Sequence, residues 1–329
     1  MKAAWIDHVG PPEAIQYGDL PDPVAGPGKV LVRVRAAAVN PIDTYVRAGS
    51  VAMPLPCPFV VGCDLAGEVV GVGAGVTTLK LGDRVWGSNQ GVLGRQGTCA
   101  ELAAVDEEWL YPTPAAVSDR DAAAAALVGI TAHLGLVHHA NLQPGETVLV
   151  HGGSGAVGSM VVQMASVLGA RVVAVAGTDA GLERVRELGG VAIDRRAGDL
   201  PAAIAAACPD GVNLWWEALR EPDFDTAIAS LAEDGRVVLM AGRDARPAFP
   251  VGPFYVKQAR LIGFVMFKAA ADVQAQAAAA INSWLADGTL RVPIGAVLPL
   301  AETAKAHRLQ EEATIHRRGT LAGKIVIEP

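Results

Sequence analysis

The residues most suited to chemistry in this chain are the glycines of one short segment, Gly153-Ser154-Gly155-Ala156-Val157-Gly158. An apolar run precedes the segment and an Ala- and Val-rich stretch follows it, and in this strand–turn–helix context the spacing G-x-G-x-x-G predicts a pyrophosphate-binding loop. We expect Gly153 to permit a tight turn, Gly155 to let the backbone approach the phosphate, and Gly158 to let helix and strand pack closely. Free N–H groups at the helix start would face the anion. The alternative is a glycine-rich turn in a domain that binds no nucleotide.

The end of the next expected strand indicates which dinucleotide this loop would bind. An NAD site usually has Asp or Glu there, about 20 residues after the glycines, to bind the ribose 2′-OH. This chain has Ala176-Gly177-Thr178 instead, and Asp179 could cap the following helix. Gly177 leaves room for a 2′-phosphate, and Arg195 and Arg196 could supply its counter-charge. The sequence therefore favours NADPH over NADH, with a solvated turn as the alternative for the two arginines.

Strand and helix patterns alternate around this loop, as is typical of a parallel sheet with helices on both faces. The expected strands are 148–151, 172–176, 212–217 and 237–240, and the expected helices are 156–168, 182–188 and 224–232. The first 120 residues are instead β-rich, with expected strands at 30–35, 68–72 and 84–86. A helix at 272–286 and a strand at 324–328 end the chain. We expect this tail to complete a β-rich domain of 1–121 and 268–329, beside a doubly wound α/β domain of 122–267.

Composition argues against several classes of function. The chain of 329 residues, 51% hydrophobic and 19% charged, is typical of a globular protein with about two domains. A net charge of −7 makes it a poor candidate for binding nucleic acid or an anionic membrane. We expect no signal peptide, and we interpret the uncharged stretches 122–145 and 147–170 as buried parts of a soluble core.

Cysteine and histidine placement predicts neither disulfides nor a metal site. The cysteines at 57, 63, 99 and 208 form no C-x-x-C pair, and their sparse use fits a reducing cytoplasm. A zinc site needs three or four Cys, His or carboxylate ligands. His138 and His139 are adjacent and would point about 100° apart on a helix. Cys63-Asp64 is the one place where a thiol and a carboxylate are neighbours. We therefore predict no metal.

Segments over nearly the whole chain resemble those of one family. The segments 26–49 and 61–87, the VHGGSGAVG loop, the AGT at 176–178 and the terminal LAGKIVIEP are similar to those of the zinc-independent quinone oxidoreductases. These form the ζ-crystallin-like branch of the medium-chain dehydrogenase/reductase superfamily. Cys63-Asp64 stands where the zinc-dependent members carry a His-Glu pair. Their catalytic cysteine near Asn40 and their four-cysteine lobe at 88–100 are also absent.

The resemblance implies a GroES-like catalytic domain, a Rossmann-type cofactor domain and a cleft between them. It implies NADPH-dependent reduction of quinones or other activated enones by a homodimer or homotetramer, with the strand at 261–265 pairing across a two-fold axis. Negative charge builds on the substrate oxygen during hydride transfer and must be stabilised. Asn40 and Tyr45 resemble the family's active-site polar pair. Tyr45 would donate to the oxygen or to the cofactor, and Asn40 would donate or hold Tyr45 in place. Alternatively, Asn40 satisfies a turn and Tyr45 only packs.

Further cofactor contacts follow from position and resemblance. Thr131 would lie near the nicotinamide and Lys324 would belong to a cofactor-side Gly-Lys, unless Lys324 is a strand-edge charge. Gly242, Phe264 and Met266 are candidates for the nicotinamide end, with core packing as the alternative. The expected cofactor-binding set is Thr131, Gly153, Ser154, Gly155, Ala156, Val157, Gly177, Thr178, Arg195, Gly242, Phe264, Met266 and Lys324.

Two other functions remain open at this point. One is reduction of an enoyl thioester of the acrylyl-CoA type, for which Arg47 and Arg243 are the nearby basic candidates. The other is a non-enzymatic role as a structural or nucleotide-binding protein.

Overall fold

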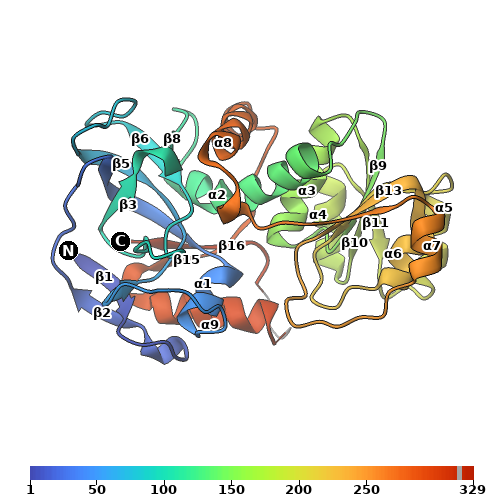
Figure 1. The fold of residues 1–329 in the computed structure, drawn as a ribbon, viewed down its shortest axis with the longest axis horizontal. Helices are drawn as coiled ribbons and strands as arrows, with labels where there is room; N and C mark the ends of the chain where they lie inside the picture. The colour runs from blue at the N-terminus through green and yellow to red at the C-terminus, as the bar shows by residue number, and fades with distance from the viewer. Residues whose placement is uncertain (317–320) are drawn as a thin grey trace. The chain divides into compact units, whose positions relative to one another are not determined.

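The chain forms two compact units in a computed structural model that describes residues 1–316 and 321–329 (Figure 1). One unit comprises Met1–Val128 with Ala270–Pro329, and the other comprises Gly129–Ala269. The division falls inside helix α2 (Asp119–His133). The Gly129–Ala269 unit contains one sheet, and the other unit contains two.

The unit Gly129–Ala269 is built on a six-stranded sheet in the order β11-β10-β9-β12-β13-β14, with every neighbouring pair parallel. Its strands are β9 (Thr147–His151), β10 (Arg171–Ala176), β11 (Val191–Asp194), β12 (Val212–Glu217), β13 (Leu231–Leu239) and β14 (Arg260–Gly263). The strand order reverses direction between β9 and β12. In a doubly wound fold this switch point is where a dinucleotide binds, and the predicted Rossmann-type architecture is confirmed.

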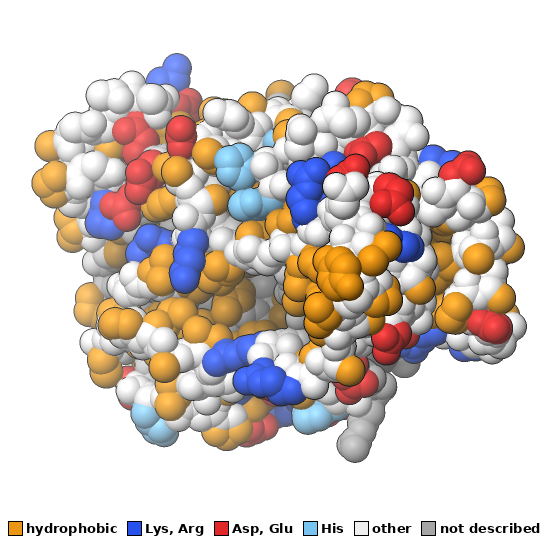
Figure 2. Space-filling view, turned by 45° about the vertical axis from the view of Figure 1, so that its right-hand side comes forward, with side chains coloured by type: hydrophobic (Ala, Val, Ile, Leu, Met, Phe, Trp, Pro, Cys, Tyr) orange, Lys and Arg blue, Asp and Glu red, His pale blue; other side chains and the backbone are white. Residues whose placement is uncertain are grey.

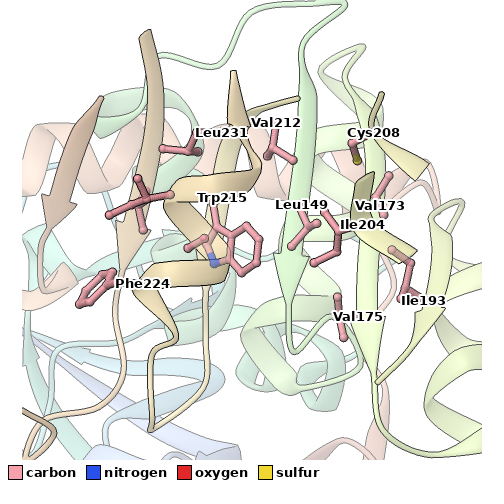
Figure 3. Packing of buried hydrophobic residues seen from close by; sticks show 13 residues of the cluster. Leu149, Val173, Val175, Ile193, Ile204, Cys208, Val212, Trp215, Phe224 and Leu231 are labelled. Atoms are coloured by element: carbon pink, nitrogen blue, oxygen red, sulfur yellow. The ribbon is translucent and has the colours of Figure 1, made fainter. Parts of the chain in front are cut away.

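Helices cover the sheet of this unit and bury its apolar strands. They are α3 (Ala156–Val167), α4 (Asp179–Glu187), α5 (Leu200–Ala207), α6 (Phe224–Ser230) and α7 (Val251–Val256), preceded by a π-helical turn at Leu134–His139. Figure 3 shows Leu149, Val173 and Trp215 of neighbouring strands packed in one cluster with Ile204 of α5. Each is fully or almost fully buried. Because alanine in place of such a residue typically costs about 2–5 kcal/mol, this cluster contributes strongly to the stability of the sheet.

The other unit is β-rich. Its larger sheet has the order β15-β16-β3-β5-β6-β8, with β7 also paired to β3, and a smaller sheet has the order β2-β1-β4. The strands are β1 (Lys2–Ile6), β2 (Gln16–Asp19), β3 (Lys29–Val39), β4 (Phe59–Val60), β5 (Asp64–Val72), β6 (Arg84–Gly87), β7 (Leu102–Asp106), β8 (Leu110–Pro112), β15 (Ile294–Pro299) and β16 (Lys324–Glu328). The helices are α1 (Pro41–Arg47), α8 (Ala271–Ala286) and α9 (Thr303–Thr314), with short 3₁₀ turns at Pro12–Ala14, Glu107–Trp109 and Leu300–Glu302. A further 3₁₀ turn, Met266–Lys268, ends the Gly129–Ala269 unit. Because β16 lies between β15 and β3, the tail does fold back into the first domain, as expected.

Three strands extend four or more residues beyond their predicted bounds, and one of them is β5, which begins at Asp64 and not at Glu68. β3 continues to Val39 because Ala36–Val39 are all buried, so the alternation that marks a half-buried strand is lost there. β13 begins at Leu231, six residues before the predicted start, across a register shift in its pairing with β12. The helical stretch Asp119–His139 is long and apolar enough to span a membrane, but 72% of its most apolar window is buried inside the protein. That burial agrees with its interpretation as a core helix.

Candidate active site

The glycine loop joins β9 to α3, and each of its glycines is needed for a different steric reason. The left-handed conformation lies at Gly152, with φ +97°, and not at Gly153 as the motif predicted. Gly153 is required for packing instead, because a Cβ there would lie 2.5 Å from Cβ of Ala174 in β10. A Cβ at Gly158 would overlap the carbonyl of Gly152, which confirms the close packing expected there. At Gly155 a Cβ would meet only Gly152 O, at 3.3 Å.

The start of α3 offers unsatisfied donors beside this open glycine. Gly155 is the N-cap and provides no side-chain acceptor for the first N–H groups of the helix. Gly155 is exposed, and Ser154, Ala156 and Val157 are half-buried. The first turn of a helix carries N–H groups that have no intrahelical partner and a partial positive charge. The loop therefore has the donors and the space that a pyrophosphate needs.

The turn after β10 brings a guanidinium over Gly177. A Cβ built at Gly177 would lie 3.1 Å from Nη2 of Arg195, so this arginine covers the position that Asp or Glu occupies in NAD sites. Thr178, and not Asp179, caps α4, because its Oγ1 accepts a hydrogen bond from Gly181 N at 3.0 Å. Gly177 and Arg195 thus lie together, as a 2′-phosphate site requires.

The second predicted arginine is engaged elsewhere. The guanidinium of Arg196 is hydrogen-bonded to Asp179 and to Asp194, which holds the pKa of Asp194 at about 2. Arg196 is therefore already compensated by two carboxylates. Sequence analysis missed Arg184 of α4, whose Nη1 lies 3.4 Å from the carbonyl of Ser154 in the glycine loop. The signal in the sequence was a basic residue in the helix that follows β10, on the side of the helix that faces the glycine loop.

The candidates for the nicotinamide end differ in how accessible they are. Met266 is 2% exposed and Thr131 is 5% exposed, and the burial of Met266 favours the core-packing alternative. Phe264 is half-buried and stacks on His139, with ring centroids 4.5 Å apart. Gly242 has φ +78°, and a Cβ there would lie 2.8 Å from Arg220 O, so the turn after β13 needs glycine. The contacts of these residues with a cofactor stay predictions.

A buried pair that sequence analysis missed lies at the switch point of the sheet. Nδ1 of His151, the last residue of β9, lies 2.8 Å from Oε2 of Glu217, the last residue of β12. The other oxygen of Glu217 accepts a hydrogen bond from Leu219 N at 2.8 Å. The pair therefore ties together the turns that follow the two strands. An acidic residue that ends an apolar strand was the sequence signal.

In the β-rich unit, Asn40 lies at the start of α1 with its side chain fully buried. Its Nδ2 donates to Asp64 Oδ2 at 2.7 Å and to Ala38 O at 3.3 Å, and its Oδ1 accepts from Lys324 Nζ. Both amide hydrogens are thus used inside the protein. This geometry disfavours the expected donation to a substrate; the contacts of Asn40 are with Ala38, Asp64 and Lys324, around the turn that leads into α1.

Lys324 lies inside the unit, not at an edge. β16 has a partner on each side, so the strand-edge alternative is wrong. The side chain is 3% exposed, and Nζ donates to Val39 O at 2.9 Å as well as to Asn40. Asp64 Oδ2 lies 3.8 Å from Nζ. The ammonium group is therefore committed to this interior, and direct contact with a cofactor stays an unsupported prediction.

Two buried carboxyl groups of this unit, Asp64 and Asp43, differ in how many partners they have. Ser88 Oγ donates to Asp64 Oδ1 at 2.6 Å, so Asp64 has hydrogen-bond donors on both oxygens and Lys324 as its counter-ion. Asp43 Oδ2 accepts from Asn40 N at 2.7 Å, but Oδ1 has no hydrogen-bond partner. Burial is the main cause that raises the pKa of Asp43 to about 7, and the charge of Asp64 adds to it. Burial likewise lowers the pKa of Lys324.

Tyr45 lies two residues after Asp43 on the same short helix and is half-buried. The far end of α1 is also fixed, because the guanidinium of Arg47 is 1% exposed and pairs with Glu311 of α9. The helix that carries Tyr45 is thus anchored at its first residue by Asn40 and at its last by Arg47.

The donor atoms that a zinc ion would need are not brought together. Among residues 1–316 and 321–329, no three His, Cys, Asp or Glu side chains are placed to hold a metal ion. Cys63 faces the carboxyl of Asp43, and burial raises the pKa of its thiol well above the usual value, which disfavours the thiolate that binds metals. A zinc site does not fit these residues.

Comparison with known proteins agrees with both halves of this description. Residues 26–115 match the family described as alcohol dehydrogenase GroES-like domain, and residues 156–283 match the family described as zinc-binding dehydrogenase. The chain is 31% identical to a quinone oxidoreductase of Sus scrofa over 330 residues, covering 99% of this chain and 97% of that protein.

Two further similarities are informative. The chain is 37% identical over 228 residues to an NADPH-dependent alkenal/one oxidoreductase of Arabidopsis thaliana chloroplasts, covering 67% of this chain and 57% of that protein. Its fold is similar to that of a mycobacterial protein solved in complex with NADPH, with a TM-score of 0.85, 28% identity and full coverage of both chains.

Proposed function

The chain belongs to the medium-chain dehydrogenase/reductase superfamily, among the quinone oxidoreductases, and from this premise we propose that it uses NADPH to reduce quinones or other activated enones without a metal ion. The observation that carries the cofactor is the guanidinium of Arg195 over Gly177, beside an open glycine loop. A similar protein was solved with NADPH, and two relatives are named for reduction of quinones or of alkenals and alkenones.

The residues of this chain have distinct roles in binding the cofactor. The N–H groups at the start of α3 bind the pyrophosphate, and Gly155 lets it approach the backbone. Arg195 binds the 2′-phosphate, with Arg184 as a second positive charge nearby. Bound NADPH supplies a hydride from the nicotinamide C4 to an electron-poor carbon of the substrate.

Tyr45 is the catalytic residue in this proposal. Negative charge develops on the substrate oxygen as the hydride is transferred, and a neutral hydroxyl donor stabilises it. Asn40 acts through α1 as a positioning residue, because its amide hydrogens are already bound to Asp64 and Ala38. No step needs a covalent intermediate.

The structure favours a quinone or enone over a CoA thioester. Recognition of CoA needs cationic groups that reach its phosphates. Arg47, one of the basic candidates, is 1% exposed and paired with Glu311. Arg243 is exposed and lies 4.0 Å from Asp244, so it is a single, partly compensated charge. Neither residue provides a phosphate-binding cluster.

We further propose a cytoplasmic homodimer. β14 is an edge strand of its sheet, and exposed apolar side chains lie on it, just after it and on α7, namely Val251, Tyr255, Val256, Leu261 and Val265. Figure 2 shows exposed apolar side chains gathered on one face of the molecule. Pairing of β14 with a second copy would cover this edge. The free cysteines fit a reducing compartment.

Turnover measurements test the reaction. NADPH oxidation should be seen with quinones or enals and should be much slower with enoyl-CoA esters. Exhaustive chelation should leave the rate unchanged, and metal analysis should find less than one zinc per chain. NADPH binding without turnover of any acceptor would support the non-enzymatic alternative, and loss of activity on chelation would overturn metal independence.

A further inference from the structure

The polar side chains around the start of α1 form a network drawn from distant parts of the chain. Asn40 precedes α1, Asp43 lies in it, Asp64 begins β5, Ser88 follows β6 and Lys324 begins β16. None of these side chains is more than 4% exposed. Polar and charged groups are rarely buried unless they are paired, so each must find its compensation inside the network.

We propose that this network is a positioning device for Tyr45, and that it holds α1 in its working position only while the carboxyl of Asp43 carries a proton. In this network Asp64, Lys324 and Asn40 form the fixed part, whose charges and hydrogen bonds stay the same. Asp43 is the variable part, because its carboxyl gains or loses a proton. None of the four touches the reacting atoms in this proposal, so all are positioning residues.

The fixed part contains an ion pair, and although burial raises the pKa of Asp64, Lys324, Ser88 and Asn40 all favour its ionised form. Asp64 accepts from Asn40 and Ser88 and has Lys324 as counter-ion at 3.8 Å. Lys324 in turn donates to Val39 O and Asn40 Oδ1, on either side of the peptide that leads into α1. Removing a buried partner from such a pair leaves an uncompensated charge, so the arrangement resists displacement.

Asp43 is less well compensated. Among the described residues, the one cation that lowers its pKa is Lys324, which already balances Asp64. The other titratable groups that face it are Cys63, Cys99 and Asp64, and none of them supplies positive charge, although the hydrogen bond between the Cys63 thiol and the carboxyl favours the ionised form. Oδ1 has no hydrogen-bond partner, while Oδ2 accepts the backbone N–H of Asn40. A protonated carboxyl suits this site, and an ionised one leaves a buried, half-satisfied negative charge.

Ionisation therefore strains the first turn of α1. Burial raises the pKa of Asp43 to about 7, so the proton is lost as the pH rises through neutrality. The carboxylate can recover hydration only if the turn moves or water enters. Tyr45 lies two residues further along this short helix, so its ring moves with the turn. The protonated state is the one that keeps the hydroxyl where the reaction needs it.

The first test follows Tyr45 directly and does not depend on activity. The protein is labelled with 3-fluorotyrosine, and the Tyr45 resonance is assigned through Tyr45→Phe among the four tyrosines. Asp43→Asn keeps an oxygen acceptor for Asn40 N and cannot ionise. Asp272→Asn, at an exposed position in the first turn of α8, is the matched control.

We expect the Tyr45 resonance to shift with a midpoint near neutrality in the wild type and in Asp272→Asn, and not in Asp43→Asn. The same shift in Asp43→Asn, or no shift in the wild type, overturns the proposal. Titration of the fluorotyrosine hydroxyl itself would remain in Asp43→Asn, so the variant separates the two effects.

The second test is kinetic and rests on the proposed reductase function. With one pKa near 7, kcat should fall roughly tenfold from pH 6 to pH 8 in the wild type. It should stay nearly level in Asp43→Asn, with the Kd for NADPH unchanged in both. An equal fall in both proteins overturns the positioning role. Absence of turnover with every acceptor, together with the expected resonance shift, would instead refute the reductase function and leave the device standing.

Discussion

Replacing Asp43 with Asn is expected to change how the free energy of unfolding depends on pH. In the folded protein burial raises the pKa of Asp43 from 3.8 to about 7. The folded state then binds this proton more tightly than the unfolded chain. The stabilisation is fully present below pH 3.8 and is lost as the pH rises through about 7. With about 1.36 kcal/mol for each unit, a shift of about three units corresponds to about 4 kcal/mol.

His307 has the opposite effect in the same unit. It is fully buried on α9, neither ring nitrogen has a hydrogen-bond partner, and burial lowers its pKa from 6.5 to about 3. Its contribution is present above pH 6.5 and is lost as the pH falls towards about 3. A shift of about 3.5 units corresponds to about 5 kcal/mol. Between about pH 4 and 6.5 the two groups oppose one another, so the wild type should show a shallow dependence.

The assay is urea unfolding of the wild type, Asp43→Asn and Asp272→Asn, followed by circular dichroism across this pH range. Because Asn cannot ionise, the free energy of unfolding of Asp43→Asn minus that of the wild type should rise by about 3 kcal/mol between pH 5 and 8. The difference between Asp272→Asn and the wild type should stay level. Parallel curves for Asp43→Asn and the wild type would show that Asp43 is already ionised at pH 5, and the reasoning would be refuted.

Three further outcomes concern the cofactor and the substrate. Arg195→Ala should weaken NADPH binding by about 1.5–3 kcal/mol, or roughly 10- to 150-fold in Kd, and leave NADH binding unchanged, whereas Arg196→Ala should have a smaller effect because two aspartates hold Arg196. Gly177→Asp should shift the ratio of dissociation constants towards NADH, since the new carboxylate would pair with Arg195 and repel a 2′-phosphate; tighter binding of NADPH than of NADH in the variant would contradict this. Tyr45→Phe should lower turnover roughly tenfold or less with quinones, because quinones accept hydride readily and the hydroxyl then contributes no more than one neutral hydrogen bond; wild-type kinetics would remove Tyr45 from the catalytic role.

The glycine loop and the elements around it could be predicted because their signals are local. A strand with three consecutive apolar residues, glycines at a fixed spacing and a helix occupy one continuous stretch, and β9 and α3 lie within a residue of their predicted ends. That stretch does not show how neighbouring strands pack. In the structure Gly153 is required because a larger residue would collide with Ala174 of β10, and not because of the turn.

The two arginines after β11 show what sequence order leaves undecided. Arg195 and Arg196 are adjacent and chemically alike, yet one covers Gly177 and the other pairs with Asp179 and Asp194. Adjacent side chains leave the backbone in different directions, and the fold decides which groups each one meets. Spacing alone could identify the pair but not the member that is available to a phosphate.

The sequence by itself determined the alternation of strands and helices, the glycine loop and the absence of an acid after β10, because each depends on residues close together in the chain. The tertiary structure alone decided the contacts of Asn40, Asp43 and Lys324. Lys324 and Asn40 are 284 residues apart in the sequence, so no local sequence pattern could predict their contact. Lys324 then lies close to Asp64 as its counter-ion, while Oδ1 of Asp43 has no hydrogen-bond partner, and in a region without water a charge is stable only where the fold brings it a partner.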